Sequence, residues 1–384
     1  LSLEQKLDYL NENDLKFMRK IEALAKHEET WKKNGINSLN YKEINVDSCG
    51  EKCEKIVVEL SNVGNVVISE EKEEVFSNVP KEILHEDEEL ENPKKQNQKS
   101  QQERFNDLVK IFYSTNPFYK SQINHELEVK FGTKGIKQLT RNDYDNVIRK
   151  LKSSEFNIVG DSSGVYNLRV NCEFLDSVTG RFKLSDVRTE IKGLHNIQTY
   201  CGNNDIKSLY KESPTSIDFI HKKPGNINKE RIYPVDFDEF NFRIAYQLEE
   251  NIKTGVKNFI LDSWKKSKKE FRFMNRVSFS HAEYPFIVDL SIVKYANRSP
   301  DKFGRENRGQ MIRVYTLEES NVLNNQEIYE IEIEIDNHRI GPSTRYNTPS
   351  SIVDALRKVI KIVLSGLQGT NFPISYPEQK SVIE

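Results

Sequence analysis

The chain has 384 residues, of which 36% are hydrophobic and 30% are charged, and its formal net charge is −2. This length allows two domains or one large domain with extensions. The near-neutral charge excludes a globally basic surface, so any nucleic-acid site must be a local basic cavity. No apolar run approaches the roughly 18 residues that a membrane span needs, so we expect no membrane association. The four cysteines are too few and too scattered for a disulfide scaffold, which indicates a reducing compartment.

The first hundred residues differ in composition from the rest of the chain. The spacing of leucines and isoleucines predicts a helix over residues 1–33, and a short strand follows at 55–60. Residues 70–104 are dominated by Glu, Lys, Asn and Gln, which is typical of a solvated linker. We therefore assign 1–104 to a partly disordered N-terminal extension of unknown role. The absence of an initiator methionine leaves open that the chain is part of a longer protein.

Three helices are predicted after residue 100, two before the segments that alternate with period two and one after them. We expect a short helix over 103–112. A second helix opens at Thr140, a plausible N-cap with Asp143 three residues on in a weak capping box. A last helix is predicted over 350–365, with Ser350 as its cap and an apolar stripe along one face.

Between roughly 155 and 335, most segments alternate apolar and polar residues with period two and are separated by Gly, Asn, Pro and Ser. This pattern is typical of antiparallel β-structure. Successive side chains of a strand point to opposite faces, so an alternating segment separates its apolar and polar residues. Together with the helices, the pattern predicts an α+β fold.

Two alternating segments place glutamates on one face. The first contributes Glu126, Glu128 and Lys130. The second contributes Glu330, Glu332 and Glu334. Each segment alone is compatible with an ordinary strand that has a charged, solvated face. However, same-face carboxylates two residues apart lie ~7 Å from each other and repel by about 2 kcal/mol at an effective dielectric near 20. The pair of segments therefore suggests a compensating cation, and Mg²⁺ or Mn²⁺ prefers carboxylate oxygens.

The segments between these two strands carry basic residues. Arg243 shares a polar face with Asn241, Gln247 and Glu249. Arg272, Met274, Arg276 and Ser278 share another, and Asp289 and Ser291 a third. A single arginine of this kind is more often a surface residue or an ion-pair partner. Closed into a barrel, however, these strands would direct arginines and glutamates into one lumen, which suits a metal–triphosphate complex because guanidinium groups bind phosphate oxygens bidentately.

Several common phosphate and metal motifs are absent from the sequence. There is no Gly-x4-Gly-Lys-Ser/Thr loop, which excludes a P-loop NTPase. There is also no G-x-G-x-x-G and no His-Glu-x-x-His motif, and the seven histidines lack a ligand-like spacing.

The two glutamate motifs resemble those of the triphosphate tunnel metalloenzymes. Within that family, the chain most resembles the RNA triphosphatase domain of the mRNA-capping enzymes of large DNA viruses. The similar strings are HELEVKFGT (125–133), VDFDEFNFRIAYQLEEN (235–251) and VLSGLQGTNFPISYPEQKSVIE (363–384). The resemblance implies a closed antiparallel barrel of about eight strands with flanking helices. It places this barrel at 105–366, followed by a linker at 367–384 into a downstream guanylyltransferase domain.

The resemblance also implies roles for individual residues. Metal ligands would be Glu126, Glu128, Glu332 and Glu334. Catalytic residues would be Glu330, Glu332 and Lys130. Substrate phosphates would be contacted by Arg243, Arg272, Arg276, Asp289 and Ser291. Fungal members carry basic residues where Met274 and Ile287 stand here, so the phosphate contacts depart from the family pattern, and Arg272 could substitute.

The implied function is a Mg²⁺- or Mn²⁺-dependent RNA 5′-triphosphatase that hydrolyses the β–γ phosphoanhydride in the first step of cap synthesis. Nucleoside triphosphates are expected as side substrates, and guanylyltransferase and methyltransferase domains of the same polypeptide as partners. The expected location is the cytoplasm, in a viral factory or a virion. Two alternatives stay open: a tripolyphosphate or thiamine-triphosphate hydrolase of the same barrel class, and a non-catalytic barrel that binds polyanions. The chain lacks a Lys-x-Asp-Gly motif, so it should not itself form a covalent GMP adduct.

Overall fold

The computed structural model describes residues 79–80, 83, 99–118, 123–132, 137–177, 179–228, 230–300 and 309–383. The helix predicted over 1–33, the strand predicted at 55–60 and most of the predicted linker lie outside the described residues. The expected helix at 103–112 is α4 (Gln101–Thr115), which begins slightly earlier, inside the segment assigned to the linker.

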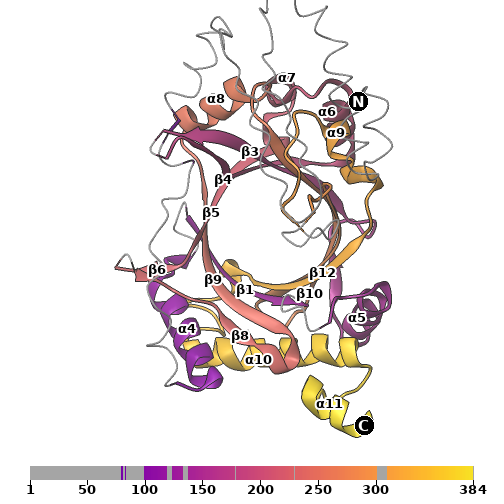
Figure 1. Cartoon of the computed structure of the whole chain (residues 1–384). Coiled ribbons are helices and arrows are strands. Elements are labelled where there is room, and N and C mark those ends of the chain that lie inside the picture. Colours follow the sequence, from indigo (N-terminus) through magenta and orange to yellow (C-terminus); the bar gives the residue numbers. More distant parts are fainter. Residues whose placement is uncertain are drawn as a thin grey trace, which may run out of the picture. The chain divides into compact units, whose positions relative to one another are not determined.

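Eight antiparallel strands form a closed barrel, which Figure 1 shows as a ring seen along its axis. Around the ring the order is β1, β12, β11, β10, β3, β4, β5 and β9, and β9 pairs with β1 to close it. The bounds are β1 (Ile123–Phe131), β3 (Val165–Asp176), β4 (Arg181–Lys192), β5 (Ile217–Pro224), β9 (Phe242–Asn251), β10 (Lys269–Ser280), β11 (Phe286–Tyr295) and β12 (Ile328–Ile335). The expected barrel is therefore confirmed.

Short elements decorate this barrel. Strand β2 (Asn157–Val159) pairs with β10, β8 (Val235–Phe237) pairs with β9, and β6 (Asn226–Ile227) pairs with β7 (Glu230–Arg231). Four 3₁₀ turns lie at Pro214–Ser216, Asp238–Phe240, Val322–Asn324 and Asn337–Arg339 within the described ranges. The short helix α9 (Leu317–Ser320) precedes β12, and α11 (Tyr376–Ile383) follows the last long helix.

Three helices cover one side of the barrel: α4, α5 (Arg141–Ser153) and α10 (Pro349–Gln368). The predicted capping box of Thr140 and Asp143 at the start of α5 is confirmed. The predicted cap Ser350 is wrong, because Thr348 caps α10 and Pro349 occupies the first helical turn. Proline suits that position, since its missing N–H would have no partner within the helix.

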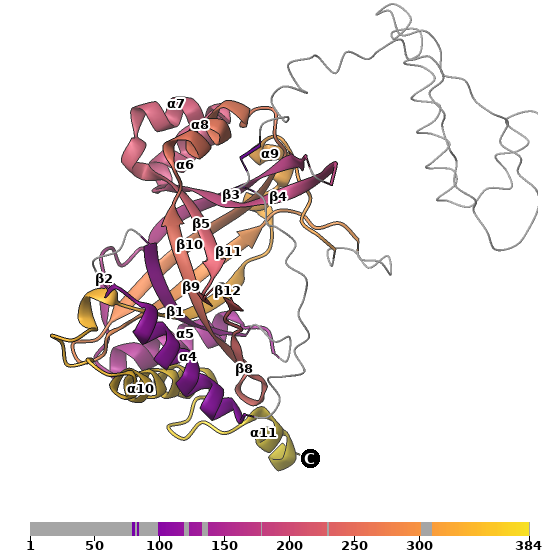
Figure 2. The ribbon, with the colours of Figure 1, turned by 90° about the vertical axis from the view of Figure 1, so that its left-hand side faces the viewer.

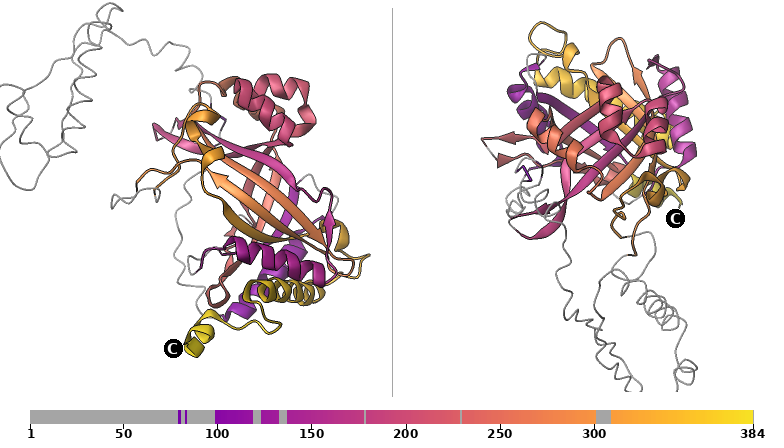
Figure 3. Two further views of the ribbon diagram at one scale, coloured as in Figure 1. Left: turned by 90° about the vertical axis from the view of Figure 1, so that its right-hand side faces the viewer. Right: turned by 90° about the horizontal axis from the view of Figure 1, so that it is seen from above.

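Helices α6 (Leu194–Asn203), α7 (Ile206–Glu212) and α8 (Thr254–Ser263) gather on the opposite side of the barrel. Figure 2 shows them at the far end from α10, and the left view of Figure 3 shows the same separation from the other side. These three helices were not predicted from the sequence, because most of residues 155–335 alternate with period two and were expected to form strands and turns. No helix among the described residues is both long enough and apolar enough to cross a membrane.

The barrel has its apolar faces outside and its charged faces inside. Leu127 and Val129 of β1 point outward into a core shared with α4, α5 and α10. Leu168 and Val170 of β3 pack outward into a second core that includes residues of α6, α7 and α8. The intervening residues of each strand must therefore face the lumen, because side chains alternate along a strand. Burial of the outer faces thus fixes which side chains point inward.

Candidate active site

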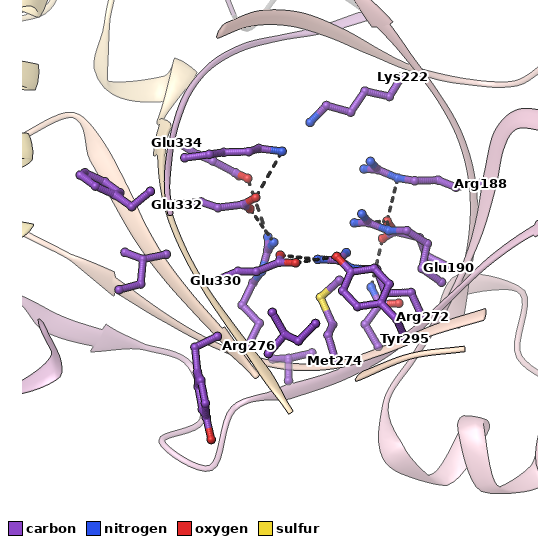
Figure 4. A pocket seen from close by; sticks show the side chains of 18 of the residues that line it. Arg188, Glu190, Lys222, Arg272, Met274, Arg276, Tyr295, Glu330, Glu332 and Glu334 are labelled. Atoms are coloured by element: carbon purple, nitrogen blue, oxygen red, sulfur yellow. Dashed lines mark hydrogen bonds and ion pairs between the residues drawn. The ribbon is translucent and has the colours of Figure 1, made fainter. Parts of the chain in front are cut away.

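The lumen holds a cavity of about 1060 Å³, and half of the residues that line it are charged. Figure 4 looks into it: the glutamates of β12 lie on one wall, and Arg188 and Lys222 lie across the cavity from them. A cavity lined by both signs of charge would bind an apolar ligand poorly, because its polar groups would lose their hydration. It can bind a polyanion together with a cation.

The two glutamate strands are neighbours in the barrel. β1 pairs with β12, so that Glu128 lies opposite Glu334 and Lys130 lies opposite Glu332. Glu128 is almost fully buried, with 1% of its surface exposed. The two acidic rows, which are two hundred positions apart in the sequence, therefore meet on one wall, as the sequence predicted. Their assignment as metal ligands stays a prediction.

Two lysines lie between these carboxylates. The Lys130 ammonium is 3.2 Å from Glu128 Oε2 and 3.2 Å from Glu332 Oε1. The Lys222 ammonium is 2.7 Å from Glu126 Oε2 and 3.2 Å from Glu128 Oε2. Burial alone would lower the pKa of Lys130, but Glu332 and Glu128 outweigh it and raise that pKa, so Lys130 is charged near neutral pH.

Arg276 connects β10 to the neighbouring acidic wall. Its guanidinium donates to Ser291 Oγ at 3.1 Å, to Asp289 Oδ2 at 2.8 Å and to Glu332 Oε2 at 3.0 Å. It also lies 3.8 Å from Glu334 Oε1. Asp289 and Ser291, predicted to contact phosphate, are buried behind Arg276 with 4% and 1% exposure. In this arrangement they orient Arg276 rather than face the open cavity.

Arg272 lies on the same face of β10 and belongs to a separate cluster. Its guanidinium donates to Glu330 and, through Nε, to the Tyr295 hydroxyl at 3.2 Å. The Tyr295 hydroxyl in turn donates to Glu330 Oε1 at 2.7 Å. Burial, and to a lesser extent Glu330, raises the pKa of Tyr295 to about 12, so its hydroxyl remains a donor at neutral pH.

Arg243 differs from the other predicted phosphate contacts in its position. It pairs in register with Lys130 at the end of β1, and it does not line the cavity. Its Nε donates to Asp236 Oδ1 at 2.6 Å, and 40% of its side-chain surface is exposed. Within the described residues, the structure thus groups Arg272 and Arg276 in the lumen and leaves Arg243 at its margin.

Arg188 of β4 and Lys222 of β5 form a basic wall opposite β12 that was not predicted from the sequence. The Arg188 guanidinium lies 2.8 Å from Glu190 Oε1 and 2.5 Å from Glu249 Oε1. Arg169 also donates to Glu190 Oε1, at 3.0 Å. A signal was present, because residues 187–192 alternate as Val-Arg-Thr-Glu-Ile-Lys, with the charged residues on the lumen face.

The carboxylates fit a divalent cation in their chemistry. Among the described residues, no three Asp, Glu, His or Cys side chains converge as they would around a bound ion, and lysine and arginine nitrogens lie between the carboxylates instead. Burial and the carboxylates of Glu249 and Glu334 raise the pKa of Glu126, despite the opposing effect of Lys222. Burial and Asp289 likewise raise the pKa of Glu334. Both carboxyl groups therefore hold a proton more tightly than usual, and a bound cation would take the place of that proton. Carboxylate oxygens suit Mg²⁺ or Mn²⁺.

Fold and cavity together define a closed, eight-stranded antiparallel barrel with a charged tunnel. No family model and no curated protein matches the chain. Among solved structures, the chain is similar to the Mimivirus capping enzyme triphosphatase, at 14% identity over 68% of this chain and 97% of that one, with a TM-score of 0.36. It is also similar to the S. pombe Pct1 RNA triphosphatase, at 12% identity over 68% of this chain and 91% of that one, with a TM-score of 0.36. A third similar structure is a chain of the S. pombe Mediator head module, at 10% identity over 63% of this chain and 95% of that one, with a TM-score of 0.31. At these identities the likeness is one of fold.

Proposed function

We propose that the chain is a metal-dependent RNA 5′-triphosphatase. The observation that supports this proposal most directly is the tunnel itself, in which an acidic wall faces a basic wall across one cavity. A 5′-triphosphate carries several negative charges on a narrow chain, so it fits a lumen that offers both guanidinium groups and a carboxylate-held cation.

In the proposed reaction, water attacks the γ-phosphorus and the bond from this phosphorus to the β–γ bridging oxygen breaks. The products are inorganic phosphate and RNA with a 5′-diphosphate. Glu126, Glu128, Glu332 and Glu334 would hold the cation, which when bound would neutralise charge on the γ-phosphate. Arg272 and Arg276 would bind phosphate oxygens, and Lys130 would stabilise charge that develops during transfer. The attacking water would be oriented by Glu332 or Glu330.

The same proposal assigns the chain to the first step of cap synthesis. The support comes from the sequence strings at 125–133 and 363–384, which resemble those of viral capping enzymes. The proposed partners are guanylyltransferase and methyltransferase domains beyond the segment 367–384. Nucleoside triphosphates are proposed side substrates, and a viral factory or virion in the cytoplasm is the proposed location.

Release of γ-phosphate tests the proposal. We expect release from triphosphate-ended RNA that requires Mg²⁺ or Mn²⁺, stops with EDTA and leaves a 5′-diphosphate end. Much faster turnover of tripolyphosphate or thiamine triphosphate than of RNA would favour a small-molecule hydrolase. No turnover of any triphosphate with either metal would favour a non-catalytic barrel and would contradict the proposal.

A further inference from the structure

Tyr295 connects two charged residues of the tunnel from the end of β11. Its hydroxyl donates to Glu330 Oε1 at 2.7 Å on β12 and accepts from Arg272 Nε at 3.2 Å on β10. Arg272 also donates to Glu330 through Nη2 and lies over the tyrosine ring, 5.5 Å from its centroid. Three adjacent strands thus contribute one residue each to a closed triangle of contacts, and Figure 4 shows the three side chains together at the cavity wall.

The triangle restricts how Arg272 can be oriented. A guanidinium has five N–H groups in one plane, and two of them are directed here to Tyr295 and Glu330. The others have no hydrogen-bond partner in the part of the chain that the structure describes, and Arg272 lines the cavity. Fixing the plane in advance matters, because an arginine side chain otherwise loses rotamer entropy when a ligand immobilises it.

The residue at the next lumen-facing position of β10, Met274, makes anion binding on this strand depend more on Arg272. Met274 also lines the cavity, is 2% exposed, and offers no N–H donor to an anion. Among the β10 residues that line the cavity, the side-chain donors are therefore Arg272 and Arg276. Arg276 is already engaged by Asp289, Ser291 and Glu332. This leaves Arg272 as the less saturated of the two guanidinium groups.

We propose that Tyr295 is a positioning residue that orients Arg272, through the shared contact with Glu330, to bind a phosphoryl group in the tunnel. This inference rests on the proposed function, because it concerns the same substrate. Without the hydroxyl, Arg272 can rotate to give both Nε and Nη2 to the two oxygens of Glu330. In that bidentate pair, the N–H groups of Arg272 point at Glu330 and away from the cavity. Glu330 is then the internal partner of Arg272, and Glu332 orients the water.

A binding measurement without metal tests this role independently of turnover. Affinity for inorganic tripolyphosphate is measured by titration calorimetry in EDTA for the full chain and for Tyr295→Phe, which retains the ring but lacks the hydroxyl. We expect binding to weaken about tenfold, because hydrogen bonds to charged groups contribute strongly. Tyr200→Phe is the matched control: its hydroxyl accepts from Trp264 at 3.1 Å in the second core, away from the tunnel. Equal affinities for Tyr295→Phe and the unchanged chain would overturn the inference, as would a failure of the unchanged chain to bind tripolyphosphate.

Steady-state kinetics on triphosphate RNA give a second readout. We expect Tyr295→Phe to raise KM about tenfold and to change kcat by less than about threefold, since the lost orientation affects ground state and transition state alike. In an Arg272→Lys background, the same change should have no further effect, because the two residues act as one unit. If Tyr295→Phe raised KM by the same factor in the Arg272→Lys background as in the unchanged chain, the positioning role of Tyr295 would be overturned. If the unchanged chain releases no phosphate from RNA, the proposed function fails, while the calorimetric result still decides whether Tyr295 positions Arg272.

Discussion

The ammonium group of Lys222 lies 2.7 Å from a carboxylate oxygen of Glu126, although β5 and β1 are separated around the barrel by β9. Lys222 also lies 3.2 Å from Glu128 and 3.3 Å from Glu249. A lysine from the basic wall thus reaches two of the carboxylates that are proposed to hold the metal. The positive charge of Lys222 compensates the same carboxylates that a divalent cation would compensate. We therefore expect the presence of Lys222 to affect how much a bound metal stabilises the fold.

Lys222→Ala should make the fold more dependent on divalent metal. In EDTA the variant removes the lysine partner of Glu126 and leaves Glu128 with Lys130 alone, at a cost on the order of 2 kcal/mol, since Lys222 is partly exposed. Added Mn²⁺ should therefore raise the Tm of the variant more than that of the unchanged chain. Thermal denaturation with and without Mn²⁺ measures both effects. Lys223→Ala is the control, because Lys223 pairs with Glu250 outside the cavity; an identical Mn²⁺ shift in all three proteins would contradict the coupling.

Glu128→Gln should abolish turnover while preserving the barrel. The substitution keeps the shape of a side chain that is 1% exposed and removes the charge next to Lys130 and Lys222. We expect phosphate release from RNA to fall at least ~100-fold, as it does when a group that stabilises transition-state charge is lost. Glu332→Gln should behave in the same way. Glu250→Gln, on the opposite face of β9 from Glu249, is the control that should retain activity. Preserved Tm together with preserved activity in Glu128→Gln would contradict the assignment.

Local alternation predicted which way side chains face, but not where each lies along the tunnel. The faces of β1 and β12 were predictable because side chains alternate on every strand and the apolar set must be buried. Arg243 obeys the same alternation, yet it lies opposite Lys130 at the end of β1 and outside the cavity lining. Its position depends on the register between β9 and β1, which strand pairing and barrel closure determine and no local pattern encodes.

Contacts between strands that are not direct neighbours were unpredictable for a related reason. Arg188 of β4 contacts Glu249 of β9, and Lys222 of β5 contacts Glu126 of β1, although neither pair of strands is hydrogen-bonded directly. Such contacts follow from the order of strands around the ring, because closure brings together side chains that are distant in the sequence. The alternating segment 187–192 would have identified Arg188 as lumen-facing once a barrel was expected.

Acid should remove the stabilising contribution of the capping box of α5, the helix beside β12. Burial alone would raise the pKa of Asp143, but hydrogen bonds from Thr140 and the contact with Lys137 outweigh it and hold this pKa below its usual value. A carboxyl group with a lowered folded-state pKa stabilises the fold above its unfolded pKa of about 4, and this contribution is lost as the pH falls through the folded value.

Asp143→Ala should therefore reduce the free energy of unfolding by about 1–2 kcal/mol at pH 7, and the difference from the unchanged chain should shrink below about pH 4. Denaturant unfolding at several pH values measures the difference. The control is Asp145→Ala, which removes an exposed pair with Arg141 and should change stability by about 0.5 kcal/mol or less. A difference that stays constant down to pH 3 would contradict the ionised capping box.

Arg188 and Arg243 provide a direct comparison between a lumen arginine and a marginal one. The Arg188 side chain is 13% exposed, lines the cavity and contacts Glu190 and Glu249, whereas that of Arg243 is 40% exposed and engaged by Asp236. We expect Arg188→Ala to lower kcat/KM for triphosphate RNA about 100-fold and Arg243→Ala to lower it less than about threefold. Arg188→Lys should recover part of the loss, because it restores the charge without the planar fork. With Tm recorded for each variant, a larger loss from Arg243→Ala than from Arg188→Ala would show that the phosphates bind at the margin of the barrel instead of opposite the acidic wall.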